Sequence, residues 1–330
     1  MKYTQLGRTG LKVSRLTLGT MNFGPLTNEP DSHTIMDAAL DAGINYFDTA
    51  NVYGWDENKG RTEEILGTWF TQGGERRDKV VLATKVYGNM AVDGKPAWPN
   101  HDLLSAVNIR RSVEASLKRL QTDYIDIYQF HHIDRRTPFE EIWQAIDTLV
   151  AQGKILYAGS SNFPGYKIAQ ANETAARRGS YGLVSEQCLY NLAERSAEME
   201  VIPASQEYGL GVIPWSPLHS GLLGGVLKKE GEGKRRTGGR AAAELAKPEV
   251  RAQVQAYEDL LDKHGLAPGE VALAWLLTRP GVTGPIVGPR TSEQLTSALR
   301  AVELELSEEL LGALDEIFPG PGPSPESFAW

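Results

Sequence analysis

Eight short apolar runs rich in β-branched residues recur along this chain, and each is followed by an amphipathic segment. Most of the runs begin about thirty residues apart, which is the length of one strand–helix unit of a parallel sheet. Eight alternations favour a closed (β/α)8 TIM barrel of the α/β class over an open doubly wound sheet, which usually has fewer strands. The predicted strands cover residues 15–19, 45–49, 80–85, 124–131, 155–160, 182–187, 211–216 and 284–287.

The alternation of apolar runs and amphipathic segments continues through the chain without a composition change that would mark a second domain. We therefore expect one domain over residues 1–330. Residues 3–13 place a Gly-Arg-Thr-Gly turn between two extended stretches, which predicts an N-terminal β-hairpin at one end of the barrel. The wide gap between the seventh and eighth runs predicts a long loop after strand 7. Residues 228–240 (KKEGEGKRRTGGR) are glycine-rich and basic, which fits either a solvated loop or a lid over an anionic ligand.

Helix starts are also visible in the sequence. Thr137, Pro138 and Glu140 predict a capping box with proline at the first helical position, ahead of an apolar stripe. Thr291 and Gln294 repeat the capping pattern. Both sites fit helices that follow strands of a barrel.

Charge and composition narrow the classes of partner. Lys and Arg number 34 against 42 Asp and Glu, and the resulting net charge of −8 argues against nucleic acid or an anionic membrane as the main partner. The single cysteine, Cys188, excludes an intramolecular disulfide and a multi-cysteine metal site, and we expect no bound metal. There is no apolar run long enough to span a bilayer and no signal-peptide pattern after Met1, so a cytoplasmic location is expected. Walker, Rossmann and His-Glu-x-x-His motifs are missing from the sequence.

Ionisable side chains gather at the carboxyl ends of the predicted strands, where barrels of this kind place their active sites. The second run ends in Asp48 and continues to Tyr53, Lys85 ends the third, and His131 and His132 end the fourth. Each of these residues alone would also suit a structural ion pair or packing. Together they predict that Asp48 pairs with Lys85, and that the lysine charge lowers the pKa of Tyr53 toward that of a usable proton donor. The two histidines are expected on opposite faces of the strand, and alternation does not say which one enters the barrel mouth.

With these residues in place, the sequence resembles the aldo-keto reductase superfamily over nearly its whole length. Residues 45–54 (NYFDTANVYG) resemble the stretch that holds the catalytic Asp and Tyr of that family, and residues 84–85 resemble the strand end with its catalytic Lys. Residues 124–134 (YIDIYQFHHID) resemble the strand that ends in the catalytic His. The resemblance implies that Asp48, Tyr53, Lys85 and His131 are catalytic, and it selects His131 over His132.

The resemblance also implies an NADPH cofactor, with NADH as a further possibility. Ser161 and Asn162 match the pair that binds the nicotinamide carboxamide, Gln187 completes that contact, and Trp215 matches the ring stacked on the nicotinamide. Arg290 before a capped helix suits a phosphate on physical grounds as well. The remaining residues that the resemblance assigns are Ser216, Leu218, Gly221 and Leu223 for the pyrophosphate, and Gly288, Arg290 and Gln294 for the adenosine 2′-phosphate.

The implied reaction is the reduction of an aldehyde, ketone or sugar aldehyde to the alcohol, with Tyr53 as the general acid. Two alternatives remain open from the sequence: a cofactor-binding regulatory subunit like the potassium-channel β subunits, which resemble this family, and an aldolase-type barrel with Lys85 as a Schiff-base lysine. If the protein is a carbonyl reductase, its expected partner is a small-molecule carbonyl compound. The sequence does not indicate an oligomeric state. The predicted substrate pocket consists of Met21, Phe23, Trp55, Tyr87 and Trp98.

Overall fold

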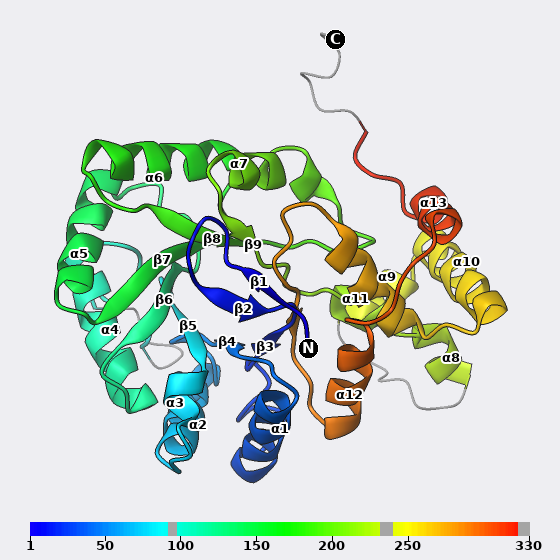
Figure 1. Ribbon diagram of the computed structural model, residues 1–330, viewed down its shortest axis with the longest axis horizontal. Helices are drawn as coiled ribbons and strands as arrows, with labels where there is room; N and C mark the ends of the chain where they lie inside the picture. The colour runs from blue at the N-terminus through cyan, green and yellow to red at the C-terminus, as the bar shows by residue number, and fades with distance from the viewer. Residues whose placement is uncertain (92–97, 232–239, 323–330) are drawn as a thin grey trace, which may run out of the picture.

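Eight parallel strands form the centre of the computed structural model, which describes residues 1–91, 98–231 and 240–322 (Figure 1). The strand order is β10-β3-β4-β5-β6-β7-β8-β9. The ring closes between its outer strands because Val212 bridges to Val282 and the Ile286 N–H donates to the Pro214 carbonyl at 2.8 Å. The predicted barrel is therefore confirmed, and all eight predicted runs contain a strand: β3 (Thr17–Gly19), β4 (Tyr46–Asp48), β5 (Val81–Val86), β6 (Ile125–Phe130), β7 (Ile155–Ser161), β8 (Leu183–Gln187), β9 (Gly211–Val212) and β10 (Ile286–Val287).

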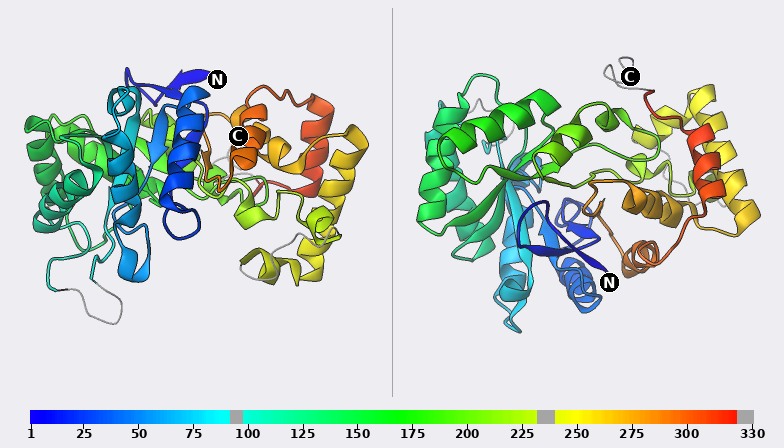
Figure 2. Two further views of the ribbon diagram at one scale, coloured as in Figure 1. Left: turned by 90° about the horizontal axis from the view of Figure 1, so that it is seen from below. Right: turned by 45° about the horizontal axis from the view of Figure 1, so that its top comes forward.

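The predicted N-terminal hairpin is also confirmed. Strands β1 (Tyr3–Gln5) and β2 (Lys12–Ser14) pair antiparallel and lie across one end of the barrel (Figure 2). Leu6 and Val13 from this hairpin are fully buried and pack against inward-facing barrel residues such as Ile127. Gly7 has a positive φ, and a Cβ atom there would lie 2.4 Å from the Gly209 carbonyl oxygen, so the turn requires glycine. The hairpin thus closes the amino-terminal end of the barrel.

Helices surround the sheet and cover its outer face (Figure 1). The largest hydrophobic cluster lies between the strands and these helices, with Trp69, Phe130 and Trp143 among its buried side chains. The surrounding helices are α1 (Glu29–Asp41), α2 (Arg61–Phe70), α3 (Arg76–Lys79), α4 (Ala106–Leu120), α5 (Phe139–Ala151), α6 (Gly165–Arg177), α7 (Val201–Glu207), α11 (Pro268–Thr278) and α12 (Ser292–Arg300).

One of the two predicted capping boxes is wrong. Helix α5 begins at Phe139 with Pro138 as the N-cap residue and no side-chain cap, so proline is not its first helical residue. Thr137 instead donates its hydroxyl to the Asp134 carboxylate at 2.7 Å, because Asp134 folds back over the turn that precedes the helix. At α12 the prediction is confirmed, since the Thr291 side chain accepts a hydrogen bond from the Gln294 N–H.

The connection after β9 is long, as expected, but its described part is largely helical. Helix α8 (Val226–Gly231) and helix α9 (Arg240–Leu245) include the ends of the basic segment that the sequence predicted as loop, and residues 232–239 lie outside the described residues. At these described ends the helical turns are stabilised by a small apolar cluster of Leu222, Val226 and Leu245, which the glycine-rich composition did not indicate. Helix α10 (Pro248–His264) follows and packs beside α13 (Glu308–Ile317), outside the ring of the other helices (Figures 1 and 2).

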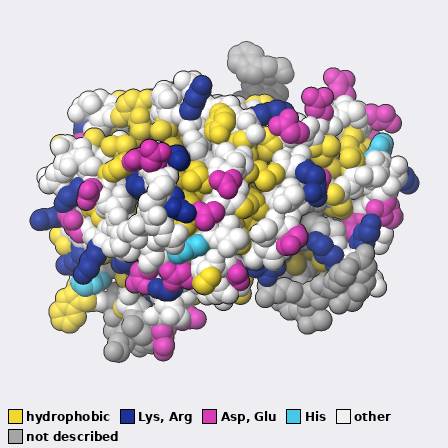
Figure 3. Space-filling model, turned by 60° about the horizontal axis from the view of Figure 1, so that its bottom comes forward, with side chains coloured by type: hydrophobic (Ala, Val, Ile, Leu, Met, Phe, Trp, Pro, Cys, Tyr) yellow, Lys and Arg dark blue, Asp and Glu magenta, His cyan; other side chains and the backbone are white. Residues whose placement is uncertain are grey.

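The surface shown in Figure 3 carries Lys and Arg side chains interspersed with Asp and Glu, and the basic side chains do not gather in one patch on that face. None of the helices in residues 1–91, 98–231 and 240–322 has the length and apolar character needed to cross a membrane. The same residues contain no group of three or more His, Cys, Asp or Glu side chains placed to hold a metal ion.

Candidate active site

The predicted ion pair between Asp48 and Lys85 is confirmed. The register of β4 against β5 places Asp48 opposite Ala83, so Lys85, two residues further, projects from the same inner face above it. Lys85 is fully buried, and its Nζ donates to Asp48 Oδ1 at 2.6 Å and to the Thr49 carbonyl at 2.9 Å. Its third donor reaches the Tyr53 hydroxyl at 3.1 Å. All three ammonium protons therefore have partners, as a buried lysine requires.

The second carboxylate oxygen of Asp48 accepts two amide donors. Gln129 Nε2 lies 2.8 Å and Gln187 Nε2 lies 2.9 Å from Asp48 Oδ2. Gln129 is fully buried in β6 directly opposite Lys85 in the strand register. Gln129 was not among the predicted site residues, although a polar residue two positions before His131 on the predicted strand was a usable signal. Asp48 is thus oriented from three strands, and Gln187 orients it through the side chain assigned to the cofactor.

The electrostatics of this group correct one prediction. Burial raises the pKa of Tyr53 above its ordinary value, and the Lys85 charge opposes that shift without reversing it. For Lys85 itself, burial lowers the pKa, but the neighbouring Asp48 and Tyr53 outweigh burial, so its pKa is raised. The expectation that the pKa of Tyr53 is lowered is wrong in this structure, because burial destabilises the phenolate more than the Lys85 charge stabilises it. Lys85 remains a cation and Tyr53 remains a protonated phenol.

His131 and His132 do not point to opposite faces of a strand. Strand β6 ends at Phe130, so the alternation expected at these positions does not apply. The two imidazole rings stack with centroids 4.9 Å apart and planes 5° from parallel. The His131 ring meets the Tyr53 ring edge-on at 6.0 Å, so His131 is the histidine beside the phenol. Burial first and the Lys85 charge second lower the pKa of His131 well below its ordinary value, which keeps the imidazole neutral.

The residues assigned to the nicotinamide lie next to this group. Ser161 donates to the Gln187 carbonyl at 2.9 Å, and Asn162 Nδ2 donates to the His131 carbonyl at 3.1 Å. The Trp215 indole N–H donates to Asn162 Oδ1 at 3.0 Å. Asn162 has a φ of +59°, an unusual conformation for a residue with a side chain, and such strain is common at functional sites. Direct contacts therefore join these residues to the Asp48 and Lys85 group.

The loop assigned to the pyrophosphate follows Trp215 and runs over η3 (His219–Gly221). Ser216 has a φ of +55° and Gly221 a φ of +101° with open space where a Cβ would stand. Leu218 is half-buried, whereas the Leu223 side chain is fully buried and its N–H donates to the Leu218 carbonyl at 3.2 Å. Helix α9 packs against η3, so the described end of the basic segment lies directly on this loop.

The segment at the start of α12 has the features of an anion site. The Gly288 carbonyl accepts from Asn22 Nδ2 at 2.8 Å, and the Arg290 N–H donates to Gln294 Oε1 at 2.8 Å. Gln294 thus forms part of the capping arrangement with Thr291. Within residues 1–91, 98–231 and 240–322, the Arg290 guanidinium has no hydrogen-bond or ion-pair partner. A free guanidinium beside a capped helix N-terminus fits a phosphate group.

The predicted pocket residues lie in different environments. Phe23 is fully buried in the main hydrophobic cluster, so its ring is not accessible to a ligand in this structure. Trp55 is 43% exposed and tilts against the Tyr53 ring at 5.7 Å, and Tyr87 meets the His132 ring edge-on at 5.2 Å. The other two predicted pocket residues are exposed: Met21 at 46% and Trp98 at 74%.

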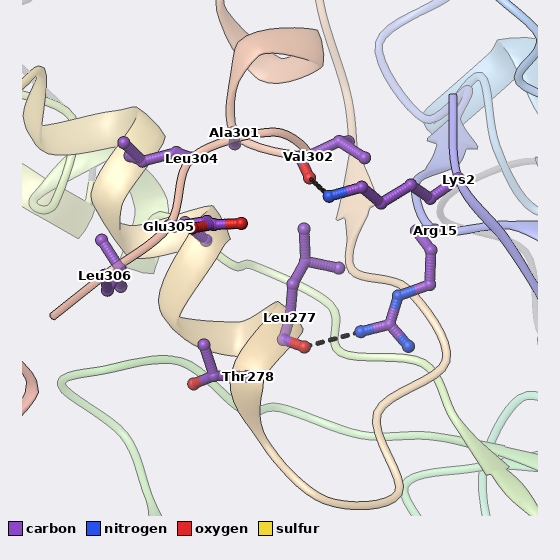
Figure 4. Close-up of a pocket in the computed structure, with 10 residues that line it drawn as sticks. Lys2, Arg15, Leu277, Thr278, Ala301, Val302, Leu304, Glu305 and Leu306 are labelled. Atoms are coloured by element: carbon purple, nitrogen blue, oxygen red, sulfur yellow. Dashed lines mark hydrogen bonds between the residues drawn. The ribbon is translucent and has the colours of Figure 1, made fainter. Parts of the chain in front are cut away.

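A separate cleft of about 400 Å³ lies at the opposite end of the barrel (Figure 4). Arg15 precedes β3 there and donates to the carbonyls of Leu277 at 2.6 Å and Val282 at 2.9 Å. Lys2 donates to the Val302 carbonyl at 3.1 Å. Both cations are engaged by the backbone and tie the N-terminal residues to the last helices, so this cleft does not share the chemistry of the Asp48 and Lys85 group.

Comparison with known proteins agrees with this geometry. Residues 15–318 match the aldo/keto reductase family. The uncharacterized oxidoreductase YrpG of Bacillus subtilis is 54% identical over all of both chains. The versiconal hemiacetal acetate reductase of Aspergillus parasiticus is 33% identical over 96% of each chain. A probable voltage-gated potassium channel subunit beta of Arabidopsis thaliana is 32% identical over 99% of this chain and 100% of the relative. The barrel, its buried Asp–Lys–Tyr contacts and these matches together show that the chain belongs to the aldo/keto reductase family of NAD(P)H-dependent oxidoreductases.

Proposed function

We propose that this protein uses NADPH to reduce the carbonyl group of a small aldehyde, ketone or sugar aldehyde to an alcohol. One observation carries the proposal: Asp48, Lys85 and Tyr53 form an unbroken chain of short contacts, with the Lys85 ammonium bonded to both the carboxylate and the phenol. The phenol is an acid placed beside a fixed positive charge. This arrangement suits the delivery of one proton to an oxygen that gains negative charge.

Each side chain of the site has a separate role in the proposed reaction. Tyr53 donates its proton to the carbonyl oxygen, and Lys85 stabilises the phenolate that remains. Asp48, oriented by Gln129 and Gln187, fixes the ammonium group in place. The neutral His131 imidazole beside the phenol orients the carbonyl oxygen. When bound, the nicotinamide supplies the hydride that adds to the carbonyl carbon, so one hydride and one proton together yield the alcohol.

The cofactor assignment is supported by groups that can receive it. Ser161, Asn162 and Gln187 carry polar side chains at the mouth of the barrel, and the half-buried Trp215 ring offers a face for stacking. The Arg290 guanidinium, positioned beside the start of α12, favours the extra phosphate of NADPH. The loop Ser216, Leu218, Gly221 and Leu223 would hold the pyrophosphate, and Gly288 and Gln294 would accompany Arg290. We infer that exposed Met21, Trp55 and Trp98, with Tyr87, form the substrate side.

The Schiff-base mechanism and the regulatory role, the two alternative functions, are supported to different degrees. A Schiff-base lysine must lose its proton to act as a nucleophile, whereas Lys85 is held as a cation by Asp48 and its pKa is raised, which disfavours that chemistry. A regulatory role receives support from relatives named as potassium channel subunits. Such a protein would bind the cofactor without needing rapid turnover, so turnover on a simple carbonyl separates the two.

The test is titration of the purified protein with NADPH and NADH, followed by Trp fluorescence, and then turnover on aromatic, aliphatic and sugar aldehydes. Tyr53→Phe removes the proton donor and should lower kcat by about 10² to 10⁴-fold, while the Kd of NADPH stays unchanged. Tight binding without turnover of any carbonyl compound would favour the regulatory role. Retention of most activity by Tyr53→Phe would refute the assignment of the general acid.

Arg290→Ala tests the choice of nucleotide. Loss of a charge-assisted contact worth about 1.5–3 kcal/mol should weaken NADPH binding by roughly 10 to 100-fold and leave NADH binding nearly unchanged. Arg279→Ala is the matched control, because Arg279 follows α11, covers the Trp275 ring of that helix and has no assigned role toward the nucleotide. Equal loss of NADPH and NADH affinity in Arg290→Ala would show that this residue does not recognise the 2′-phosphate.

A further inference from the structure

A carboxyl group lies buried directly behind the residues assigned to the nicotinamide. Glu186 in β8 has no solvent exposure. Its Oε2 lies 2.5 Å from the Ser160 hydroxyl, and its Oε1 accepts the Phe163 N–H at 3.1 Å. Among the described residues no Lys, Arg or His forms an ion pair with it. The proposed reaction does not use this group.

Counting protons shows which form of the carboxyl fits. The Ser160 oxygen lies 2.5 Å from Glu186 and also 3.3 Å from the Ser185 carbonyl, yet a hydroxyl has a single proton to donate. If Glu186 carries a proton on Oε2, it donates to Ser160, and Ser160 donates to Ser185. The other carboxyl oxygen then accepts from Phe163. The protonated acid satisfies every group, whereas the carboxylate would compete for the Ser160 proton and bury an unpaired charge.

The two hydrogen-bond partners of Glu186 flank the turn that carries Ser161 and Asn162, the residues assigned to the nicotinamide. Ser160 and Phe163 lie on either side of Ser161 and Asn162. Asn162 is held at positive φ, and its side chain contacts both Trp215 and the His131 carbonyl. A strained turn persists only where its surroundings fix it, and the Glu186 carboxyl bonds both ends of this one.

We propose that Glu186 is a positioning residue that is held as a neutral acid, fixes the turn 160–163 for the nicotinamide, and weakens cofactor binding when it ionises. This inference rests on the proposed function, because it assigns the same turn to the cofactor. It adds a pH dependence that belongs to the binding step and not to proton donation by Tyr53.

The charge environment is consistent with this role. Burial raises the pKa of Glu186 to about 8, against the opposing effect of its hydrogen bonds. The groups facing it from neighbouring elements are poor in charge: β9 and the turn 162–164 hold no titratable side chain, and the Tyr157 side chain lies near the far end of β7. On α6, Lys167 is directed toward Gln170 and the ring of Phe139. In the residues that follow β8, burial raises the pKa of the Cys188 thiol, so the thiol stays neutral.

The test measures the Kd of NADPH by Trp fluorescence from pH 6 to about 10 in the wild-type protein and in Glu186→Gln. A turn that is competent only with the neutral acid should bind with a Kd that rises about tenfold for each pH unit above pH 8. The amide that Glu186→Gln introduces can keep both hydrogen bonds and cannot ionise, so the variant should bind with a nearly constant Kd. Glu140→Gln, at an exposed position on α5, is the control and should follow the wild type.

A second measurement does not involve the cofactor. Infrared spectra of the wild-type protein at pH 7 should contain the C=O stretch of a protonated carboxyl group, which disappears as the pH rises past 8 and is missing from Glu186→Gln. Identical pH profiles in both proteins, or no such band at pH 7, would overturn the inference. Presence of the band with no NADPH binding at any pH would instead refute the proposed function. The infrared titration of the wild type decides the protonation state even if the variant does not fold.

Discussion

The two ends of the barrel use side chains of the same kinds for different purposes. Residues other than glycine with a positive φ gather mainly in loops at the carboxyl ends of strands, as at Trp55, Asn162 and Ser216. Left-handed turns at the amino-terminal end more often use glycine, for example Gly153 before β7 and Gly209 before β9, although Glu75 and Gln121 also have a positive φ there. Local strain is thus more frequent at the candidate site than at the end that stabilises the barrel.

The half-buried Arg15 and the buried Lys85, at opposite ends of the barrel, differ in their hydrogen-bond partners. Arg15 at the amino-terminal end donates to backbone carbonyls, which cannot exchange protons in the physiological range. Lys85 at the carboxyl end donates to a carboxylate and to a phenol, and the phenol carries a proton that it can donate. The partner of the cation, more than the cation itself, therefore distinguishes a structural contact from a candidate catalytic group.

Lys85→Met should show the largest effect. The substitution leaves the buried Asp48 carboxylate without its counter-ion, so the free energy of unfolding should fall by about 3–5 kcal/mol, and kcat should fall by at least about 10²-fold. Urea unfolding and steady-state turnover measure the two effects. The double variant Asp48→Asn/Lys85→Met removes the stranded charge and should regain part of the stability while remaining inactive. Activity that returned with stability would show that Lys85 acts only by supporting the fold.

Arg15→Met should destabilise the protein without changing its chemistry. Two carbonyl groups at the amino-terminal end lose their donor, which should lower the free energy of unfolding by about 1–3 kcal/mol. The kcat and KM of the folded protein should match those of the wild type, because the strand ends that carry the site are not touched. Lys2→Met, at a more exposed position, should have a smaller effect on the melting temperature. A parallel loss of kcat in Arg15→Met would break the division between the two ends.

A pair of substitutions tests the use of strain and should give the smallest changes. Gly153→Ala places a side chain at a φ of +69° and should cost about 1–2 kcal/mol of stability, with no change in NADPH affinity. Asn162→Gly relieves a similar strain but removes the contacts to Trp215 and His131, so its stability should change by less than about 1 kcal/mol while NADPH binding weakens. Thermal unfolding and fluorescence titration separate the two outcomes. The contrast between the two ends fails if both variants change only stability.

Local patterns were sufficient to predict the barrel and the polar residues at its mouth. Apolar periodicity located every strand, and the strand-end positions of Asp48 and Lys85 predicted their contact, because parallel strands bring their carboxyl ends to one edge. The start of α12 was predicted for the same reason, since Thr291 and Gln294 act within a single helical turn.

Features that depend on distant partners were not predicted. Gln129 binds Asp48 across 81 positions of sequence, and no local pattern indicates that pairing. The stacking of His131 on His132 follows from the exact end of β6, which alternation could not place. The turns of α8 and α9 depend on apolar contacts among residues far apart in the connection, such as Leu222 and Leu245, whereas composition alone indicated a loop.

The closure of the barrel is uneven. Strands β9 and β10 contain two residues each, whereas β6 and β7 contain six and seven. The seam between β9 and β10 is therefore held by few backbone hydrogen bonds, and amide hydrogens there should exchange with solvent through local openings of low free energy. Because β9 leads directly into the 216–223 loop and β10 into the Arg290 segment, the proposed assignment would place the pyrophosphate and the 2′-phosphate of a bound dinucleotide along this seam. A ligand that bridges the seam would slow amide hydrogen exchange on both strands at once and stabilise the closure of the barrel.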